Sequence, residues 1–108
     1  MSQITTHVLD TSLGKPAQGI AIRLEQNRKT IGQGFTDADG RINGLLPEGT
    51  SLPPGEYQMV FETGGYFQKQ GLTGFYPKVV IHFSTSDESH YHIPLLLTPF
   101  GYSTYRGS

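Results

Sequence analysis

The chain has 108 residues, a net charge of −1 and no cysteine. Its length suits one hydrophobic core, so we expect residues 1–108 to form a single domain. The near-neutral charge gives no electrostatic basis for binding nucleic acid or an anionic membrane, and the lack of cysteine excludes disulfides and thiolate chemistry.

The composition and the residue pattern favour an all-β fold. Fourteen glycines and seven prolines are many for this length and predict numerous turns. Between the turns, apolar and polar residues alternate in short segments, as in half-buried strands. The expected strands cover residues 3–10, 19–26, 30–36, 56–62, 78–84, 90–97 and 102–106, with one more short strand beginning at Arg41. They predict a two-sheet β-sandwich of seven to eight strands, with one short helix over residues 65–70.

No segment predicts export or membrane insertion. The first ten residues lack the basic and apolar regions of a secretory signal, and no apolar run approaches membrane-spanning length. We therefore expect a cytoplasmic protein with neither a membrane nor a nucleic-acid partner. Because a sandwich leaves edge strands unpaired, we also expect the last strand to pair with a second copy of the chain.

The last nineteen residues, HYHIPLLLTPFGYSTYRGS, hold two of the four histidines. Alternation places His90, His92 and Pro94 on one face of the strand. The other face is apolar and suits a core: Tyr91, Ile93, Leu95 and Leu97. In the first strand, Val8 facing the core turns His7 outward. Either histidine alone is typical of an exposed surface, but two imidazoles on neighbouring outward faces also suit proton transfer near neutral pH.

Arg41 and the last four residues are further candidates. The turn TDADGR suits aspartates that bind nearby backbone amides and a glycine with positive φ, and it ends at Arg41. Arg41 is either a solvated turn residue or a fixed guanidinium for a planar anion. Tyr105 and Ser108 either belong to a frayed tail or close over a ligand, with their hydroxyls and the terminal carboxylate as polar contacts.

His90 and His92 lie two residues apart, a spacing that also occurs in metal sites. A zinc site normally needs a third protein ligand, and no carboxylate lies at a suitable spacing, so we expect no metal. The glycines lie in turns rather than before a helix, which excludes a phosphate-binding loop. A serine nucleophile elbow is absent too.

Several segments together resemble one family: THVLD with the following GKPA, TDADGR, LPPGEYQMVFET, FYPKVVIHF and HYHIPLLLTPFGYSTYRGS. From end to end the chain resembles bacterial transthyretin-related proteins, and within them the 5-hydroxyisourate hydrolase branch. The most specific features are the final Tyr-Arg-Gly-Ser and the His-x-His-x-Pro-Leu-Leu-Leu run, which hormone-carrying transthyretins lack. His7, Arg41 and His92 match the hydrolase set. Thr98 stands where serine is usual and keeps a hydroxyl.

The resemblance implies a homotetramer with a central channel, in which sites at the dimer–dimer interface take residues from two subunits. The implied reaction hydrolyses 5-hydroxyisourate to 2-oxo-4-hydroxy-4-carboxy-5-ureidoimidazoline in urate degradation, a part of purine catabolism, without a cofactor. The resemblance gives catalytic roles to His7, Arg41, His92 and Ser108. The two histidines would deprotonate water, Arg41 and Tyr105 would bind the substrate with His7, and Ser108 would close the site.

Two other functions remain open. A carrier of the transthyretin type would bind a small aromatic ligand in the same channel without turning it over. A structural module is the second, because TDADG followed by LPPGEYQMVFE also resembles strands of surface-protein stalks. The lack of an export signal and of repeats argues against the module, and the residue types at positions 7, 41, 92 and 105–108 favour the enzyme.

Overall fold

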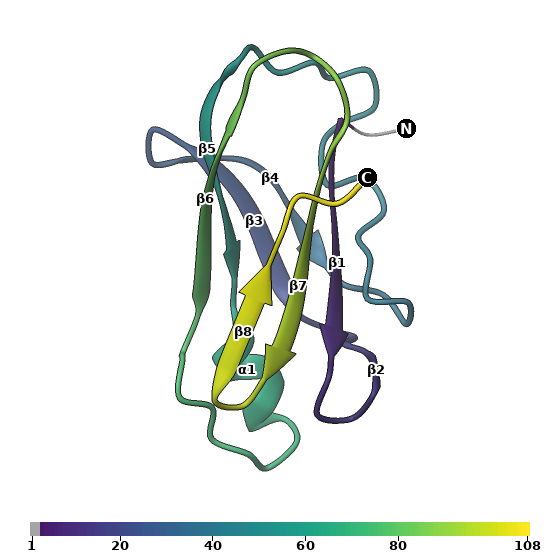
Figure 1. The fold of residues 1–108 in the computed structure, drawn as a ribbon, viewed down its shortest axis with the longest axis vertical. Coiled ribbons are helices and arrows are strands. Elements are labelled where there is room, and N and C mark those ends of the chain that lie inside the picture. Colours follow the sequence, from purple (N-terminus) through teal and green to yellow (C-terminus); the bar gives the residue numbers. More distant parts are fainter. Residues whose placement is uncertain (1–2) are drawn as a thin grey trace.

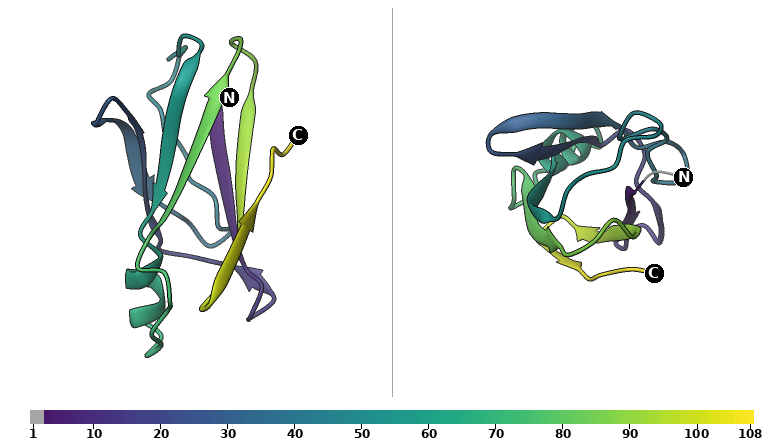
Figure 2. Two further views of the ribbon diagram at one scale, coloured as in Figure 1. Left: turned by 60° about the vertical axis from the view of Figure 1, so that its left-hand side comes forward. Right: turned by 90° about the horizontal axis from the view of Figure 1, so that it is seen from above.

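Two four-stranded sheets pack face to face in the computed structural model, which describes residues 3–108 (Figure 1). Met1 and Ser2, which the expected domain includes, lie outside the described residues. The first sheet has the order β2 (Lys15–Pro16), β1 (Ile4–Asp10), β7 (Tyr91–Thr98) and β8 (Gly101–Thr104). The second has the order β4 (Lys29–Phe35), β3 (Ala21–Gln26), β5 (Gly55–Phe61) and β6 (Val79–Thr85). The helix α1 (Thr63–Gln68) lies at one end of the sandwich (Figure 2).

The core lies between the sheets because each strand turns its apolar residues inward. Along β1 buried and half-buried residues alternate without interruption, as the period of two requires. Val8 and Leu95 of the first sheet and Leu24 and Met59 of the second have no exposed surface and belong to one cluster. The predicted two-sheet, all-β sandwich with one short helix is confirmed.

The pairing of β1 with β7 decides what lies on the outer face of the first sheet. These two strands run parallel, whereas every other named pair is antiparallel. In the β1–β7 register, Thr5 is opposite His92, and His7 is opposite Pro94. The outward residues of both strands therefore form adjacent rows on one surface.

Pro94 lies in a central strand, where proline removes one ladder hydrogen bond. The β7–β8 ladder ends at the pair of Leu95 and Thr104, and the next contact along β7 is a single bridge between His92 and Gly107. Pro94 thus sits in a gap of the ladder, and its carbonyl accepts a hydrogen bond from the Thr104 hydroxyl at 2.7 Å. It is buried, although alternation turns it away from the core.

Several details differ from the sequence-based expectations. The short strand expected from Arg41 is wrong, because residue 41 forms only an isolated bridge to His7 before the chain turns again. Residues 15–16, which lie outside the expected strands, pair with the end of β1 as β2. The helix begins two residues earlier than expected, where the Gly64 amide and the Thr63 hydroxyl bond to the carbonyls of Pro77 and Tyr76.

The last strand also ends earlier than expected, at Thr104 rather than residue 106. Arg106 instead lies against the ring of Tyr91. Within residues 3–108, α1 spans six residues, and no helix is both long and apolar enough to cross a membrane.

Candidate active site

Arg41 is held beside His7 by the turn that precedes it. One carboxylate oxygen of Asp37 accepts hydrogen bonds from the amides of Asp39 and Arg41, at 2.9 and 3.1 Å. Gly40 has a φ of 75°, and a Cβ there would lie 2.3 Å from the carbonyl oxygen of Val8, so only glycine fits. The expected turn chemistry is confirmed, and it joins Arg41 to the middle of β1.

The segment 105–108 lies against β7 and brings its last residues to the same surface (Figure 1). The Arg106 guanidinium carbon is 4.4 Å from the centre of the Tyr91 ring, a cation–π geometry. The Gly107 amide donates to the His92 carbonyl at 2.8 Å. A Cβ on Gly107 would lie 2.6 Å from Cδ2 of His92, so the chain passes this imidazole too closely for any side chain.

An open groove of about 540 Å³ brings several of these residues together. Arg41, His92 and Ser108, three of the predicted site residues, line it with Thr5, Asn43 and His90. His7 does not line the groove. Its backbone forms a β-bridge with that of Arg41, and it lies close enough to His92 to influence the pKa of that ring. The expected outward faces of His7 and His92 agree with the structure, since both are half-buried between buried neighbours.

Tyr105 lies outside this groove in the single chain. It is 59% exposed and lines a separate apolar hollow of about 230 Å³ with Phe83, Tyr91 and Arg106. His92 lines both hollows. The structure therefore brings Tyr105 near His92 but not near Arg41.

The electrostatic surroundings of His92 favour a neutral imidazole. Partial burial lowers its pKa from the ordinary value of 6.5, and electrostatic repulsion from the Arg41 guanidinium, with smaller contributions from His90 and His7, lowers it further. At neutral pH the ring is therefore unprotonated at one nitrogen and able to accept a proton. Within the described residues, the Arg41 guanidinium forms no hydrogen bond or ion pair, so it is available to an anion.

Sequence reasoning did not single out Thr5. Its hydroxyl oxygen lies 2.8 Å from Nδ1 of His92 and 2.7 Å from Nε2 of His90. The alternation of β1 places Thr5 and His7 on one face, but only the β1–β7 register reveals that Thr5 is opposite His92. His90, which the sequence suggested only for a metal, is part of this arrangement.

Known proteins with this fold share much of the sequence. A family model described as "HIUase/Transthyretin family" matches residues 4–107. The 5-hydroxyisourate hydrolase 2 of Rhizobium meliloti is 48% identical, over 98% of this chain and 96% of its own. The structure of Klebsiella pneumoniae 5-hydroxyisourate hydrolase is 38% identical, covers both chains fully and gives a TM-score of 0.90.

A transthyretin has the same fold. The structure from Sparus aurata is 32% identical, covers 99% of this chain and 97% of its own, and gives a TM-score of 0.91. Similarity along nearly the whole length, to a family model and to named relatives, establishes the family. This chain belongs to the HIUase/transthyretin family.

Proposed function

We propose that this chain hydrolyses 5-hydroxyisourate to 2-oxo-4-hydroxy-4-carboxy-5-ureidoimidazoline, a step of urate degradation. The proposal is supported by the relatives named for this activity. The observation that carries it is the groove that both a neutral His92 and Arg41 line, where Arg41 has no carboxylate partner in the part of the chain that the structure describes. A proton acceptor next to a fixed cation is what water attack on an anionic ring carbonyl needs.

In the proposed mechanism, the oxygen of a water molecule bonds to a ring carbonyl carbon, and His92 takes one of the water protons. Arg41 binds the planar substrate and stabilises the negative charge that grows on the carbonyl oxygen. The ring C–N bond then breaks, and the leaving nitrogen receives a proton from an imidazole. His7 assists from beside Arg41, Ser108 closes the groove, and none of these steps calls for a cofactor.

The assembly we propose is a cytoplasmic homotetramer with each site at a dimer–dimer interface. Two strands, β6 and β8, are at sheet edges on the same side of the sandwich, where a second copy can pair with them. Tyr105 would then contact substrate bound between subunits, which accounts for its exposure in one chain. Sedimentation of the purified protein tests the assembly separately from activity.

Following the ultraviolet decay of the transient intermediate in a mixture of urate and urate oxidase tests the activity. The protein should accelerate this decay, and His7→Ala or Arg41→Ala should remove most of the acceleration. Unchanged decay with a folded protein would contradict the proposal. It would favour the carrier function, which the similarity to Sparus aurata transthyretin supports. Binding of small aromatic ligands would then be measured.

A further inference from the structure

A single hydroxyl connects two imidazoles on the outer face of the first sheet. Thr5 Oγ1 lies within hydrogen-bond distance of His90 and His92, whose rings are stacked with centres 6.3 Å apart. A hydroxyl has one proton, so it donates to one ring and accepts from the other. Thr5 therefore makes the tautomers of the two rings depend on each other.

The direction of this chain of hydrogen bonds follows from the position of His92. Its Nδ1 faces Thr5, and among residues 3–108 its Nε2 forms no hydrogen bond. If Nε2 is to accept a proton from water, Nδ1 must carry the ring proton and donate it to Thr5 Oγ1. The Thr5 hydroxyl then donates to Nε2 of His90, which has its own proton on Nδ1.

We propose that Thr5 and His90 form a proton relay behind His92: Thr5 holds His92 in its reactive tautomer, and His90 takes up the proton. The relay adds two residues to the mechanism of the proposed hydrolysis, and it rests on that proposed function. Thr5 is thus a positioning residue, since it acts through His92 rather than on the substrate. His90 is the exposed end of the relay, where the proton can exchange with solvent.

Each transfer in the relay balances. A water proton moves to Nε2 of His92, the Nδ1 proton moves to Thr5 Oγ1, and the hydroxyl proton moves to Nε2 of His90. His92 ends neutral with its proton on Nε2, ready for the leaving nitrogen, and His90 ends as an imidazolium. The positive charge thereby leaves a half-buried ring beside Arg41 and reaches an exposed ring that water solvates. The reverse shift restores the starting tautomers.

Three substitutions separate the relay from a purely structural hydrogen bond. Thr5→Val has nearly the same shape without the hydroxyl, and Thr5→Ser keeps the hydroxyl. His90→Gln keeps an acceptor for the Thr5 hydroxyl but cannot take up a proton. His82→Gln is the matched control, because His82 is an exposed histidine on β6, in the other sheet.

The readouts are the tautomer of His92, from long-range proton–nitrogen NMR spectra of the free protein, and kcat with KM. Thr5→Val should shift His92 toward the Nε2-protonated tautomer. It should lower kcat by about tenfold, which is less than the roughly 10²–10⁴-fold contribution of an acid–base group, and keep KM within about twofold. Thr5→Ser should restore both readouts. His90→Gln should keep the tautomer but lower kcat, and His82→Gln should change neither.

The relay is wrong if Thr5→Val keeps the native tautomer, if it keeps the native kcat, or if Thr5→Ser loses activity to the same extent as Thr5→Val. Thermal unfolding of each variant shows whether it is folded. If Thr5→Val does not fold, the two other single variants, Thr5→Ser and His90→Gln, still test the relay. The NMR readout needs no turnover. A native His92 tautomer in Thr5→Val therefore rejects the relay but leaves the proposed function standing. Absence of hydrolysis by the unaltered protein rejects the proposed function itself.

Discussion

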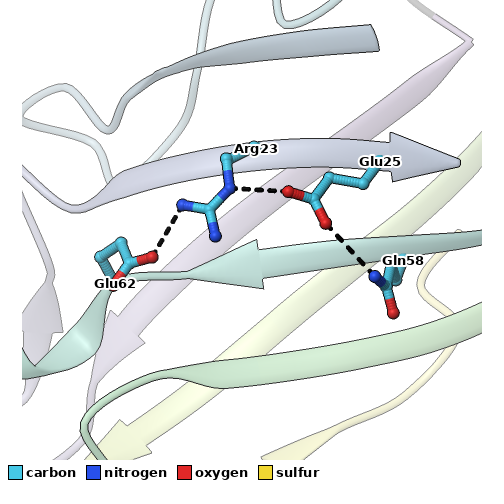
Figure 3. A network of polar contacts seen from close by, with 4 residues as sticks. All are labelled: Arg23, Glu25, Gln58 and Glu62. Carbon is cyan, nitrogen blue, oxygen red and sulfur yellow. Dashed lines mark hydrogen bonds and ion pairs between the residues drawn. The ribbon is translucent and has the colours of Figure 1, made fainter. Parts of the chain in front are cut away.

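The outer faces of the two sheets use arginine in opposite ways. On the second sheet, Arg23 donates to Glu25 at 2.8 Å and to Glu62 at 2.7 Å, and Gln58 donates to Glu25 (Figure 3). The hydrogen bonds that Arg23 donates to the two carboxylates raise its pKa, and the same guanidinium lowers the pKa of Glu25. On the first sheet, Arg41 has two histidines as neighbours and no carboxylate partner within the described residues.

The pairing of arginine distinguishes the outer face of the second sheet, an ordinary surface, from the outer face of the first sheet, where the candidate site lies. Both faces obey the same alternation, and both display half-buried polar residues. A charge that is paired within its own sheet has no strong attraction left for a ligand, whereas an unpaired guanidinium in a groove keeps its donors for one. We therefore expect substitutions on the first face to affect activity and substitutions on the second to affect only stability.

Arg41→Ala should have the largest effect. Loss of the cation that stabilises the developing oxyanion should lower kcat/KM by about 10²–10³-fold. The free energy of unfolding should change by less than about 0.5 kcal/mol, since the side chain is exposed and forms no ion pair with any residue from 3 to 108. Steady-state kinetics and urea unfolding of the same preparation check both parts. A variant that loses stability as well as activity would contradict the division between the faces.

Gly107→Ala should have the next largest effect. The added methyl group would lie 2.6 Å from Cδ2 of His92, so either the ring or the 105–108 segment must move. We expect about a tenfold loss of kcat/KM, since a displacement of about 1 Å in a catalytic group is enough for such losses. The control is Gly65→Ala, where no atom lies within 4 Å of the added Cβ. It should keep full activity, and an equal loss in both variants would refute the explanation.

The pKa of His92 gives a smaller but sharper test. Replacing Arg41 with glutamine removes a positive charge that lowers this pKa, so the pKa should rise toward 6.5, while burial keeps it below that value. Arg41→Lys keeps the charge and should leave the pKa nearly unchanged. NMR titration of a His92 ring proton measures this pKa in the unaltered protein and in both variants. A pKa that does not differ between the glutamine and lysine variants would show that Arg41 does not influence the ring.

The same shift links stability to pH. The folded protein resists protonation of His92, whereas the unfolded chain takes up this proton near the ordinary value of 6.5. The contribution of His92 to stability is therefore present above pH 6.5 and is lost as the pH falls below it. His92→Gln should flatten this part of the curve of unfolding free energy against pH, and an identical curve would contradict the link.

Arg23→Ala should have the smallest effect. Its partners Glu25 and Glu62 are partly exposed, and such pairs contribute about 0.5–1 kcal/mol or less. Activity should remain unchanged, because the network lies on the sheet opposite the groove. Lys29→Ala, at the exposed start of β4, serves as the control, because Lys29 forms no ion pair within the described residues. Loss of hydrolysis in Arg23→Ala would mean that the second face also contributes to the site.

Local patterns predicted the sheets and the direction of His7 and His92, because alternation with a period of two depends only on neighbouring residues. The TDADGR turn was predictable for the same reason. The position of Thr5 was not, because it depends on a register between strands 87 residues apart. Arg106 was not predictable either, since its contact with Tyr91 replaces a strand pairing that alternation alone favours.

The parallel pairing of β1 with β7 has a consequence for how the protein is made. The second sheet needs only residues 21–85, so its strands can pair while the rest of the chain is still being synthesised. Pairs of large sequence separation form slowly, because a long loop must close before they gain any contact. His7 and Arg41 are therefore synthesised early, but the groove beside them forms only after residues 91–108 have been added. A chain interrupted before residue 91 would lack β7, β8 and two of the residues that line the groove, His92 and Ser108, so we expect incomplete synthesis to yield an inert product rather than a partly active one.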